Sequence, residues 1–583
     1  MLCLNNSIII GIANNSIDLA NKITNIGLKM QEFLFDKNRI LVGFQSEKCI
    51  ASNANSLLLM HGIFPDETPS SLLSKSINNF ADFSKEYRYQ GVIALINSKE
   101  NIIRVLGDPA STRSIFYFVV PDVFIITTDM KLLKLITQVL DIQLEQEILA
   151  LYEILTIGYI VSRKTIFKNV NRLLPGEIFI IQMNRGFFEY RVSRYWDMIP
   201  TNSYDSREVV TKLLKSLINS LNSYCKEATG TEIAKPVSGG IDSSLLLLIT
   251  ILKAEKCSRI HAIHVNFENY NELLLSKYVT VKAGTPLDAH VISLSQTKEN
   301  YIQMLSDLLK IIGYPREGDA SLPYLALAQI IRERGIRFSI ADDEADTIYG
   351  GYDYYKFYAT QLLLEKRIPT LLKLIKILRK YNYSHEKPYS VVLRILLQLI
   401  LRFYPIRYQY FKLRLHRLFS IRNKRLTNLL AQYLAELSGV LYEAPAHNYY
   451  HEILRKMLLH KASHLVYTRV KAEESQDIVT FLPNSLREII ELIMQMPPEY
   501  SFFPIGSKSL PRLILKYLGM SPAMYLQSKS AFDITTHILR DPKILSYMVN
   551  YINRCWVSKY IKIAKLNALQ IHNLFNICIA VNS

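Results

Sequence analysis

A short sequence, Ser238-Gly239-Gly240-Ile241-Asp242-Ser243-Ser244, joins an apolar run typical of a strand (residues 232–237) to a run typical of a helix (residues 244–256). Two adjacent glycines let the backbone turn so that several N–H groups point at one centre. The following helix adds unpaired N–H groups and the positive end of its dipole. We call residues 238–243 the glycine loop and predict that it binds phosphate. A glycine turn with serine and aspartate as helix caps is the alternative.

Asp242 is unusual in an anion site, because its carboxylate repels a phosphate. The repulsion disappears if Asp242 holds Mg²⁺, which bridges to phosphate oxygens. A second motif, Ala341-Asp342-Asp343-Glu344-Ala345-Asp346, follows another strand-like run. Acids this closely spaced are costly without a cation. We therefore predict a magnesium ion shared between the two motifs, with an acidic surface turn as the alternative.

Strand-like and helix-like runs alternate around these motifs. Strands are predicted at 232–237, 260–267, 290–294 and 336–341, and helices at 207–225, 244–256, 272–283, 298–312 and 322–334. This alternation predicts an α/β fold with a doubly wound parallel sheet. Ligands of such sheets bind beyond the carboxyl ends of the strands, where both motifs lie. From residue 361 onward the pattern is almost wholly helical.

The N-terminal third of the chain has a different pattern. Short apolar or alternating runs occur at 7–12, 40–44, 91–97, 102–106, 115–120, 123–127 and 176–182. They predict a β-rich domain over residues 1–196. A polar segment with a proline, residues 199–205, is the predicted linker to a second domain over residues 206–583.

Composition narrows the class of protein. Apolar residues make up 49% of the 583 residues, as is typical of an ordered globular protein. The six cysteines form no CxxC pair, so we predict free thiols in a reducing compartment. We see no signal peptide and no apolar run long enough for a membrane span. These features predict a cytoplasmic protein without an integral membrane span.

The net charge of +18 is concentrated in one segment. Residues 351–426 contain 17 Lys or Arg and three acids, which gives 17 − 3 = +14. Leucine and isoleucine are spaced between these charges in a helical pattern. The segment fits a solvated helix face, or a surface for an acidic peptide, an anionic membrane or RNA, nucleic acid being least favoured.

Together the motifs resemble the asparagine-synthetase family along nearly the whole chain. Residues 238–243 are similar to its SGGxDS pyrophosphate loop, and residues 341–352 to its SG(D/E)GADE(L/V)FGGY motif. Residues 522–532 are similar to its P-x-x-I/V-x-x-R-x-K-x-x-F motif. In the N-terminal half, Gly107-Asp108, Thr128-Asp129-Met130-Lys131 and Tyr195-Trp196 resemble segments of the family's amidotransferase domain.

The resemblance implies an N-terminal Ntn-type amidotransferase-like domain and a C-terminal ATP-pyrophosphatase domain with a large helical part. Such enzymes adenylate a carboxylate, release pyrophosphate and let an amine attack. The implied cofactors are ATP and Mg²⁺. Asp343 is expected to act on the attacking amine, and Lys529 to stabilise charge on the acyl centre. The expected ATP or pyrophosphate contacts are Val237, Ser238, Gly239, Gly240, Asp242, Ser243 and Val265, and the expected metal ligands are Asp242 and Asp346.

The chain departs from the family pattern in both halves. Glutamine-hydrolysing members begin Met-Cys-Gly, whereas this chain begins Met1-Leu2-Cys3, so removal of Met1 exposes no nucleophile. The glutamine-binding RGPD and NGExYN motifs have no recognisable counterpart, so we expect a degenerate domain without glutaminase activity. Asp342 and Glu344 replace glycines, Thr347 replaces a glutamate and Gln527 an arginine. Extra acids beside ATP would weaken nucleotide binding.

Without ammonia from glutamine, the amine comes most simply from the substrate itself. This favours a likeness to lasso-peptide macrolactam cyclases, in which a peptide's Asp or Glu side chain is adenylated and captured by its own N-terminal amine. The expected substrate is thus a peptide or small carboxylate, with a precursor peptide and a protease as partners. The alternatives are a β-lactam synthetase, an ammonia-dependent asparagine synthetase, or a non-catalytic relative that binds RNA or membrane through its basic helices.

Overall fold

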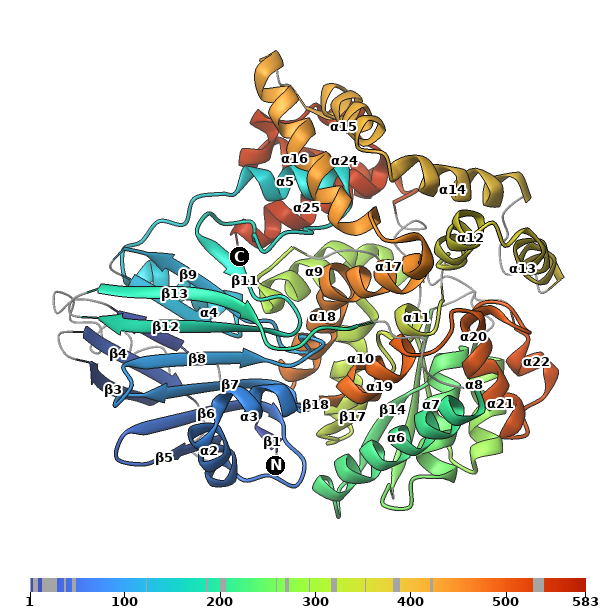
Figure 1. The fold of residues 1–583 in the computed structure, drawn as a ribbon, viewed down its shortest axis with the longest axis horizontal. Helices are drawn as coiled ribbons and strands as arrows, with labels where there is room; N and C mark the ends of the chain where they lie inside the picture. The colour runs from blue at the N-terminus through green and yellow to red at the C-terminus, as the bar shows by residue number, and fades with distance from the viewer. Residues whose placement is uncertain are drawn as a thin grey trace.

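The structure is a computed structural model of the protein. The structure describes the chain except for residues 1, 4–8, 13–28, 36–37, 45–48, 122, 185–186, 200–205, 258, 268–271, 293, 316–321, 352, 381–387, 420–422, 528–538 and 583. An antiparallel β layer from the N-terminal half lies beside a parallel sheet with its helices, and a helical lobe covers one end of both (Figure 1).

The N-terminal half is built on an antiparallel sheet in the order β1-β6-β7-β8-β12-β13, with β5 paired to β6. One face of β6 and β7 packs on helices α2 (Pro69–Asn78) and α3 (Phe80–Glu86), and the other packs on a second β layer. Both central strands are therefore buried along their whole length. The strands of the sheet are β1 (Leu2–Cys3), β5 (Ile50–Ser52), β6 (Ser56–Ile63), β7 (Gln90–Asn97), β8 (Ile102–Gly107), β12 (Glu177–Asn184) and β13 (Phe187–Arg194).

Two smaller antiparallel sheets complete this half. The first has the order β10-β9-β11, and the second has the order β2-β4-β3. The first sheet consists of β9 (Phe116–Val120), β10 (Val123–Thr127) and β11 (Val170–Arg172). The second consists of β2 (Ile9–Ile12), β3 (Lys29–Phe35) and β4 (Asn38–Phe44). Helices α4 (Met130–Val139) and α5 (Ile148–Thr156) pack against the C-terminal half, so the two halves share apolar cores.

The C-terminal half contains a five-stranded parallel sheet in the order β16-β15-β14-β17-β18. Its strands are β14 (Ile233–Pro236), β15 (Ile260–Phe267), β16 (Leu287–Ile292), β17 (Phe338–Ile340) and β18 (Val479–Phe481). Helices α6 (Ser206–Glu227), α7 (Ile241–Leu252) and α8 (Glu272–Ala283) cover one face, and α10 (Leu322–Glu333) covers the other. The chain runs outward from β14 and returns to its other side at β17, which makes the β14–β17 boundary a topological switch point.

This architecture confirms the predicted fold class: a β-rich N-terminal part and a doubly wound parallel sheet. Helix α7 begins at Ile241 rather than Ser244, because Gly240 is its N-cap. After residue 361 the named elements are helices except for β18, as the almost wholly helical pattern predicts, and the three residues of β18 are too few to show a period. The predicted linker lies almost wholly outside the described residues, so the boundary between 1–196 and 206–583 stays a prediction.

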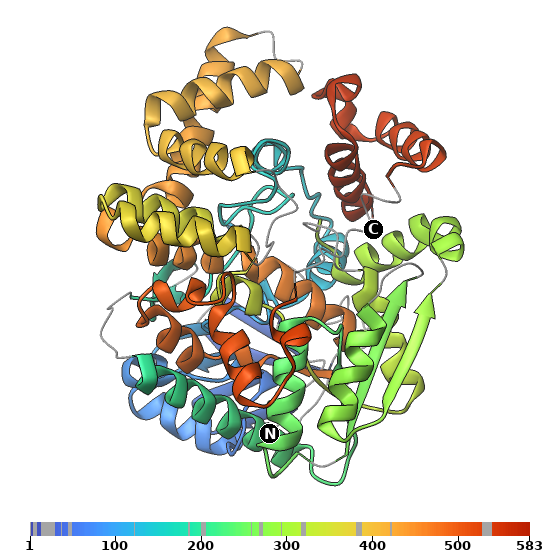
Figure 2. The ribbon, with the colours of Figure 1, turned by 90° about the vertical axis from the view of Figure 1, so that its right-hand side faces the viewer.

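The helical lobe is built from two groups of helices. The first contains α12 (Tyr355–Leu364), α13 (Ile368–Lys380), α14 (Pro388–Leu401), α15 (Tyr404–Leu418) and α16 (Lys424–Tyr442). The second is C-terminal, with α24 (Pro542–Asn553) and α25 (Ala568–Asn582), and it packs on α9 (Leu294–Ile312). Both groups lie at the same end of the molecule (Figure 2), and side chains from both belong to one apolar cluster.

The cysteine prediction is wrong for four residues. Cys225 is disulfide-bonded to Cys257 and Cys555 to Cys578, with Cα separations of 5.0 and 6.0 Å. Folding brings these pairs together, which their spacing in the sequence does not indicate. The cytoplasmic location, which rested partly on free thiols, stays a prediction. Among the described residues, no helix combines the length and apolar character needed to cross a bilayer.

Candidate active site

The glycine loop connects β14 to α7 at the switch point. Gly239 has φ +79°, a left-handed conformation that favours glycine. The Ser238 and Ser243 hydroxyls lie 3.0 Å apart, and the Ser238 and Gly240 N–H groups donate to them. Gly240, the N-cap of α7, has no side chain to accept from the first N–H groups of the helix, and an anion bound there would be an acceptor for them. The geometry is that of an anion-binding turn.

Two carboxylates converge on one cation beside this loop. Asp242 lies in the first turn of α7, and Asp346 lies in α11 (Ala345–Ile348), directly after β17. The Lys508 Nζ lies 2.5 Å from Asp346 Oδ1 and also pairs with Asp242 Oδ2. Burial alone would lower the pKa of Lys508, but the two carboxylates outweigh it and raise that pKa. The structure thus brings the two predicted metal ligands together around a single positive charge.

Close packing holds this cluster. A Cβ on Gly351 would overlap Asp346 Oδ1 and lie 2.6 Å from Lys508 Cε, so a glycine is required at that position. Lys508 has φ +59° and caps helix α21 (Ser509–Tyr517). A left-handed lysine is strained, and its conformation directs a buried ammonium at two acids.

Lys508 is the site residue that the sequence analysis missed. The predicted lysine, Lys529, lies outside the described residues. Gln527, two residues before it, donates from Nε2 to the Gly239 carbonyl over 3.0 Å. Arg512 links the residue before Lys508 to Gln527, because it donates hydrogen bonds to the Ser507 carbonyl (2.8 Å) and the Gln527 carbonyl (2.9 Å). Gln527, in the described part of the C-terminal motif, is therefore attached to the glycine loop.

The additional acid Asp342 is neutralised within the protein. The Lys235 Nζ, on the fully buried side chain of a β14 residue, lies 3.2 Å from Asp342 Oδ1. It also donates to the Pro236 carbonyl over 2.7 Å. Burial lowers the pKa of Lys235, and Asp342 opposes that shift. One of the two acids that replace family glycines is thus paired with a lysine.

Glu344, the second of these acids, occupies a left-handed position with φ +68° and is 5% exposed. Burial raises the pKa of its carboxyl to about 8. Glu344 is therefore mostly protonated at neutral pH. The expected repulsion of ATP by the extra acids is correspondingly weak.

Asp343 has a different environment. The Tyr324 hydroxyl donates to Asp343 Oδ1 over 2.5 Å, and the Arg469 guanidinium lies 4.9 Å from the centre of the Tyr324 ring. Burial of the Asp343 carboxyl raises its pKa, and Arg469 opposes this shift. A carboxyl with a raised pKa and a fixed hydrogen bond suits proton transfer.

The two predicted valines lie on neighbouring strands of the same sheet. The buried Val237 follows β14, and its carbonyl accepts hydrogen bonds from His264 Nδ1 (2.7 Å) and Ser276 Oγ (3.2 Å). Val265 is half-buried in β15. Both therefore lie near the start of the glycine loop.

The donor set can be compared with the needs of Mg²⁺. In the described part of the chain, no group of three His, Cys, Asp or Glu side chains is arranged to hold a metal. Magnesium is commonly held by one or two carboxylates together with phosphate oxygens and water. Asp242 and Asp346, which already share one cation, fit that pattern.

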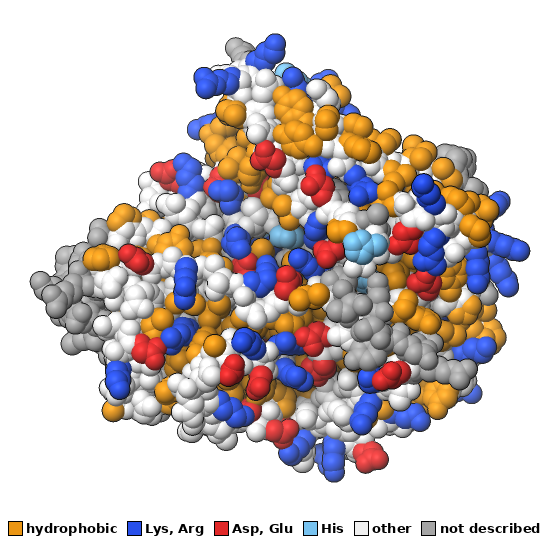
Figure 3. Space-filling model, viewed as in Figure 1, with side chains coloured by type: hydrophobic (Ala, Val, Ile, Leu, Met, Phe, Trp, Pro, Cys, Tyr) orange, Lys and Arg blue, Asp and Glu red, His pale blue; other side chains and the backbone are white. Residues whose placement is uncertain are grey.

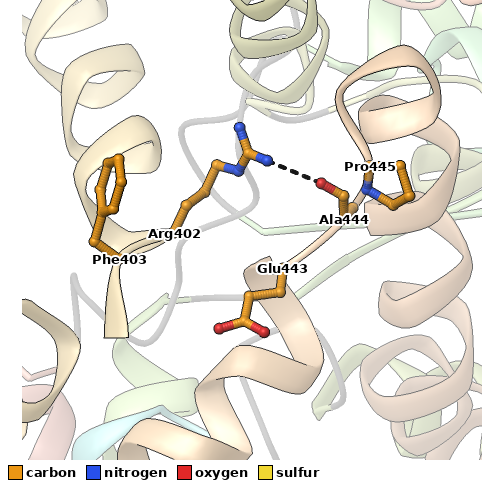
Figure 4. A pocket seen from close by; sticks show the side chains of 5 residues that line it. All are labelled: Arg402, Phe403, Glu443, Ala444 and Pro445. Atoms are coloured by element: carbon orange, nitrogen blue, oxygen red, sulfur yellow. Dashed lines mark hydrogen bonds between the residues drawn. The ribbon is translucent and has the colours of Figure 1, made fainter. Parts of the chain in front are cut away.

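A cavity of about 490 Å³ lies away from these residues. It is found where α14 meets α15, facing the chain after α16, and is lined by Arg402, Phe403, Glu443, Ala444 and Pro445 (Figure 4). The Arg402 Nη2 donates across it to the Ala444 carbonyl over 3.0 Å. None of the predicted site residues lines this cavity.

A glycine loop at the switch point of a doubly wound sheet, facing acids from the next strand, is an arrangement typical of α/β domains that bind nucleotides. Residues 229–552, more than half of the chain, match the family model described as asparagine synthase. The chain belongs to the asparagine synthase family, and its class of reaction is ATP-dependent amide formation. The matched region contains the glycine loop, the acidic motif and Lys508.

Three solved structures show weak similarity. An allosteric regulatory enzyme of purine biosynthesis is 10% identical, with 49% of this chain and 75% of that chain covered and a TM-score of 0.20. Glutamine phosphoribosylpyrophosphate amidotransferase from B. subtilis, complexed with ADP and GMP, is 12% identical (50% and 75% covered, TM-score 0.19). Glutamine-dependent NAD⁺ synthetase from Acinetobacter baumannii, complexed with ADP, is 13% identical (47% and 64% covered, TM-score 0.19). A search of curated proteins found no match. The assignment therefore rests on the family match.

Proposed function

We propose that this protein adenylates a substrate carboxylate with ATP and Mg²⁺, releases pyrophosphate, and joins the acyl group to an amine that does not come from glutamine. The proposed substrate is a peptide whose own N-terminal amine closes a macrolactam. The observation that carries the proposal is the convergence of Asp242 and Asp346 beside the glycine loop. Two carboxylates at a phosphate-binding turn serve nucleotide chemistry when they share a metal ion.

The chain's own residues have separate roles in this scheme. The glycine loop and the N-terminus of α7 bind the pyrophosphate part of ATP. Asp242 and Asp346 would hold Mg²⁺, which neutralises phosphate charge when bound. The ammonium of Lys508, which now pairs with both acids, is then free to stabilise negative charge at the reacting acyl group. Asp343, held by Tyr324, accepts a proton from the attacking amine.

The N-terminal half supports an amine source other than glutamine. Residues 53–56 and 60–64 lie nearest to the glutamine-binding motifs of the family, although neither matches them, and His61 of the second stretch is 1% exposed. The His61 ring lies 3.0 Å from Thr128 Oγ1 and 3.2 Å from Glu474 Oε1, and Arg113 Nε donates to the same Glu474 oxygen over 2.8 Å. Burial opposes ionisation of Glu474, but Arg113 and His61 hold its pKa below the ordinary value. These polar side chains connect the two halves of the protein by interacting with one another.

Pyrophosphate release by the full-length protein tests the proposal. Three substrate sets are compared in the presence of ATP and Mg²⁺: L-aspartate with ammonium, L-aspartate with glutamine, and a synthetic peptide with a free N-terminus and internal Asp and Glu. We expect release with the peptide and a product one water lighter in mass. The Asp242→Asn variant, with an unchanged melting curve, is the control for contaminating activity.

The outcomes separate the candidate functions. Release with aspartate and ammonium alone would make the protein an asparagine synthetase that uses free ammonia. Release with aspartate and glutamine, accompanied by glutamate, would contradict the proposed amine source. No release with any set, from protein that binds ATP, would favour a non-catalytic relative.

A further inference from the structure

Helices α13, α14 and α15 form an exposed surface, which we call the α13–α15 surface. By sequence, the three helices carry nine Lys or Arg and no Asp or Glu. They also expose many apolar side chains. More than half of the large apolar side chains that are exposed in the described part of the chain come from residues 368–440. Single exposed apolar residues are ordinary, whereas a gathered set indicates a binding surface.

Helix α14 presents an apolar stripe to solvent. Val392, Leu393, Leu396, Leu397 and Ile400 are all exposed, Leu393 to 64%. Their spacing of i, i+1, i+4, i+5 and i+8 places them on one face of the helix. An ordinary surface helix turns such a face toward the core. On α14, Ile395 packs in the core, and the exposed stripe is a second apolar face on the solvent side.

The stripe continues onto α15. Ile406, Tyr410 and Leu413 follow at i, i+4 and i+7, and Leu413 is 70% exposed. Phe403, at the corner between the two helices, is exposed as well. Hydrophobic side chains gather over the helices at the top and upper right of the molecule, and Lys and Arg side chains border them (Figure 3).

Helix α13 supplies much of the charge. Its Leu371, Leu374 and Leu378 face the core, which turns the remaining positions outward. Four basic residues on the outward side are exposed: Lys373, Lys376, Arg379 and Lys380. Arg407 of α15 is buried and paired with Glu443, but the three helices themselves contain no acid, so their other cations add to a single positive field.

We propose that the α13–α15 surface binds the interface of an anionic lipid bilayer. An amphipathic helix lies in that interface with its apolar face at the headgroup–acyl boundary, and Lys and Arg attract anionic headgroups. The apolar stripe of α14 and the cations of α13 and α15 supply these two features together. The proposal does not depend on the ligase site: α12, which follows the Asp346–Gly351 turn, packs on α13 and α14, so the surface and the site are neighbours in the fold.

Other partners use only part of this surface. RNA would engage the cations but leave the valine, leucine and isoleucine side chains in water. A second copy of the chain would bring two surfaces of the same sign together, which is repulsive. An acidic peptide would match the charge, yet the apolar area is spread over two helices and is not confined to one groove.

Vesicle co-sedimentation tests the proposal with full-length protein. We expect binding to vesicles of phosphatidylcholine with phosphatidylglycerol, little binding to phosphatidylcholine alone, and weaker binding at high salt. Two variants probe the two features: L393Q combined with L397Q, and K373Q, K376Q, R379Q and K380Q combined. Each is expected to weaken binding at least about tenfold.

A matched control comes from α8, which lies elsewhere on the protein. Leu274 and Val281 are 69% and 77% exposed, so L274Q combined with V281Q removes apolar side chains that are at least as exposed as Leu393 and Leu397 and should leave binding unchanged. Unchanged melting curves exclude misfolding of any variant. The proposal is overturned if the wild type does not sediment with anionic vesicles at low salt, or if the α14 variant binds as well as the α8 control. Retention on RNA or polyglutamate without vesicle binding also overturns it.

Discussion

Replacing Glu344 by glutamine should make the protein more stable than the wild type at neutral pH but not in acid. Burial raises the pKa of this carboxyl from 4.5 to about 8. Between these values the unfolded chain has released the proton and the folded protein has kept it. The unfolded state then binds fewer protons, so the stability of the wild type falls as pH rises through this window. At pH values below this window, Glu344 is protonated in both the folded and the unfolded state, and it contributes no pH dependence to the stability.

The magnitude follows from the two pKa values. One pKa unit corresponds to about 1.4 kcal/mol, so a shift from 4.5 to about 8 costs roughly 5 kcal/mol once the folded protein ionises. Between about pH 4 and pH 7, the part of this window that is easily measured, we expect a loss of about 3 kcal/mol. Glutamine has a similar shape and does not titrate, so it removes this loss.

The assay is urea unfolding, followed by circular dichroism, of wild type and Glu344→Gln at several pH values across that window. The quantity compared is the difference in unfolding free energy between the two proteins, since contributions from other titrating groups cancel. Glu344→Gly is a second variant. It should show the same pH dependence as Glu344→Gln, because it also removes the titrating carboxyl and glycine adopts the left-handed conformation without strain. A difference that stays constant from acid to neutral pH would refute the reasoning.

Four further predictions concern the chemistry of the site. Asp242→Asn and Asp346→Asn should each abolish ATP-dependent pyrophosphate release with the fold intact, since each removes a charged ligand from a hard cation; near-wild-type release would exclude a shared magnesium ion. Lys508→Met should lower amide formation by about 10²–10³ and pyrophosphate release by less, because the cation acts on charge that develops during acyl transfer; equal loss of both steps would mean that the lysine serves only to hold the acids. Lys529→Met is expected to cause the same selective loss, and two intact steps would make this lysine an ordinary surface residue. The protein should form no glutamate from glutamine, and glutamate formation that is lost in Cys3→Ala would contradict this.

The chemistry of the nucleotide site could be inferred from the sequence because it is local. A strand, two glycines and a helix N-terminus follow one another within a few residues, and their combined geometry is an anion site wherever they occur. The alternation of strands and helices also predicted the parallel sheet. That sheet in turn implied that residues after β14 and β17 lie at one edge.

Other elements lacked a local signal. Strand β6 was not predicted, because it is buried on both faces and its run of leucine and methionine shows no alternation. Strand β18 is too short for any period. The disulfide between Cys225 and Cys257 depends on α6 and the end of α7 packing side by side, which neither cysteine's neighbours in the sequence indicate.

The site itself depends on contacts between distant parts of the chain. Lys508 reaches Asp242 and Asp346 only because a left-handed turn and the packing of α21 on α7 bring residues far apart in the sequence together. Whether an acid near the nucleotide is charged is also decided by its surroundings: Lys235 pairs with Asp342, and burial keeps Glu344 protonated. A sequence specifies which groups can ionise, but the ionisation of each depends on the solvent and charges around it, and folding alone places those.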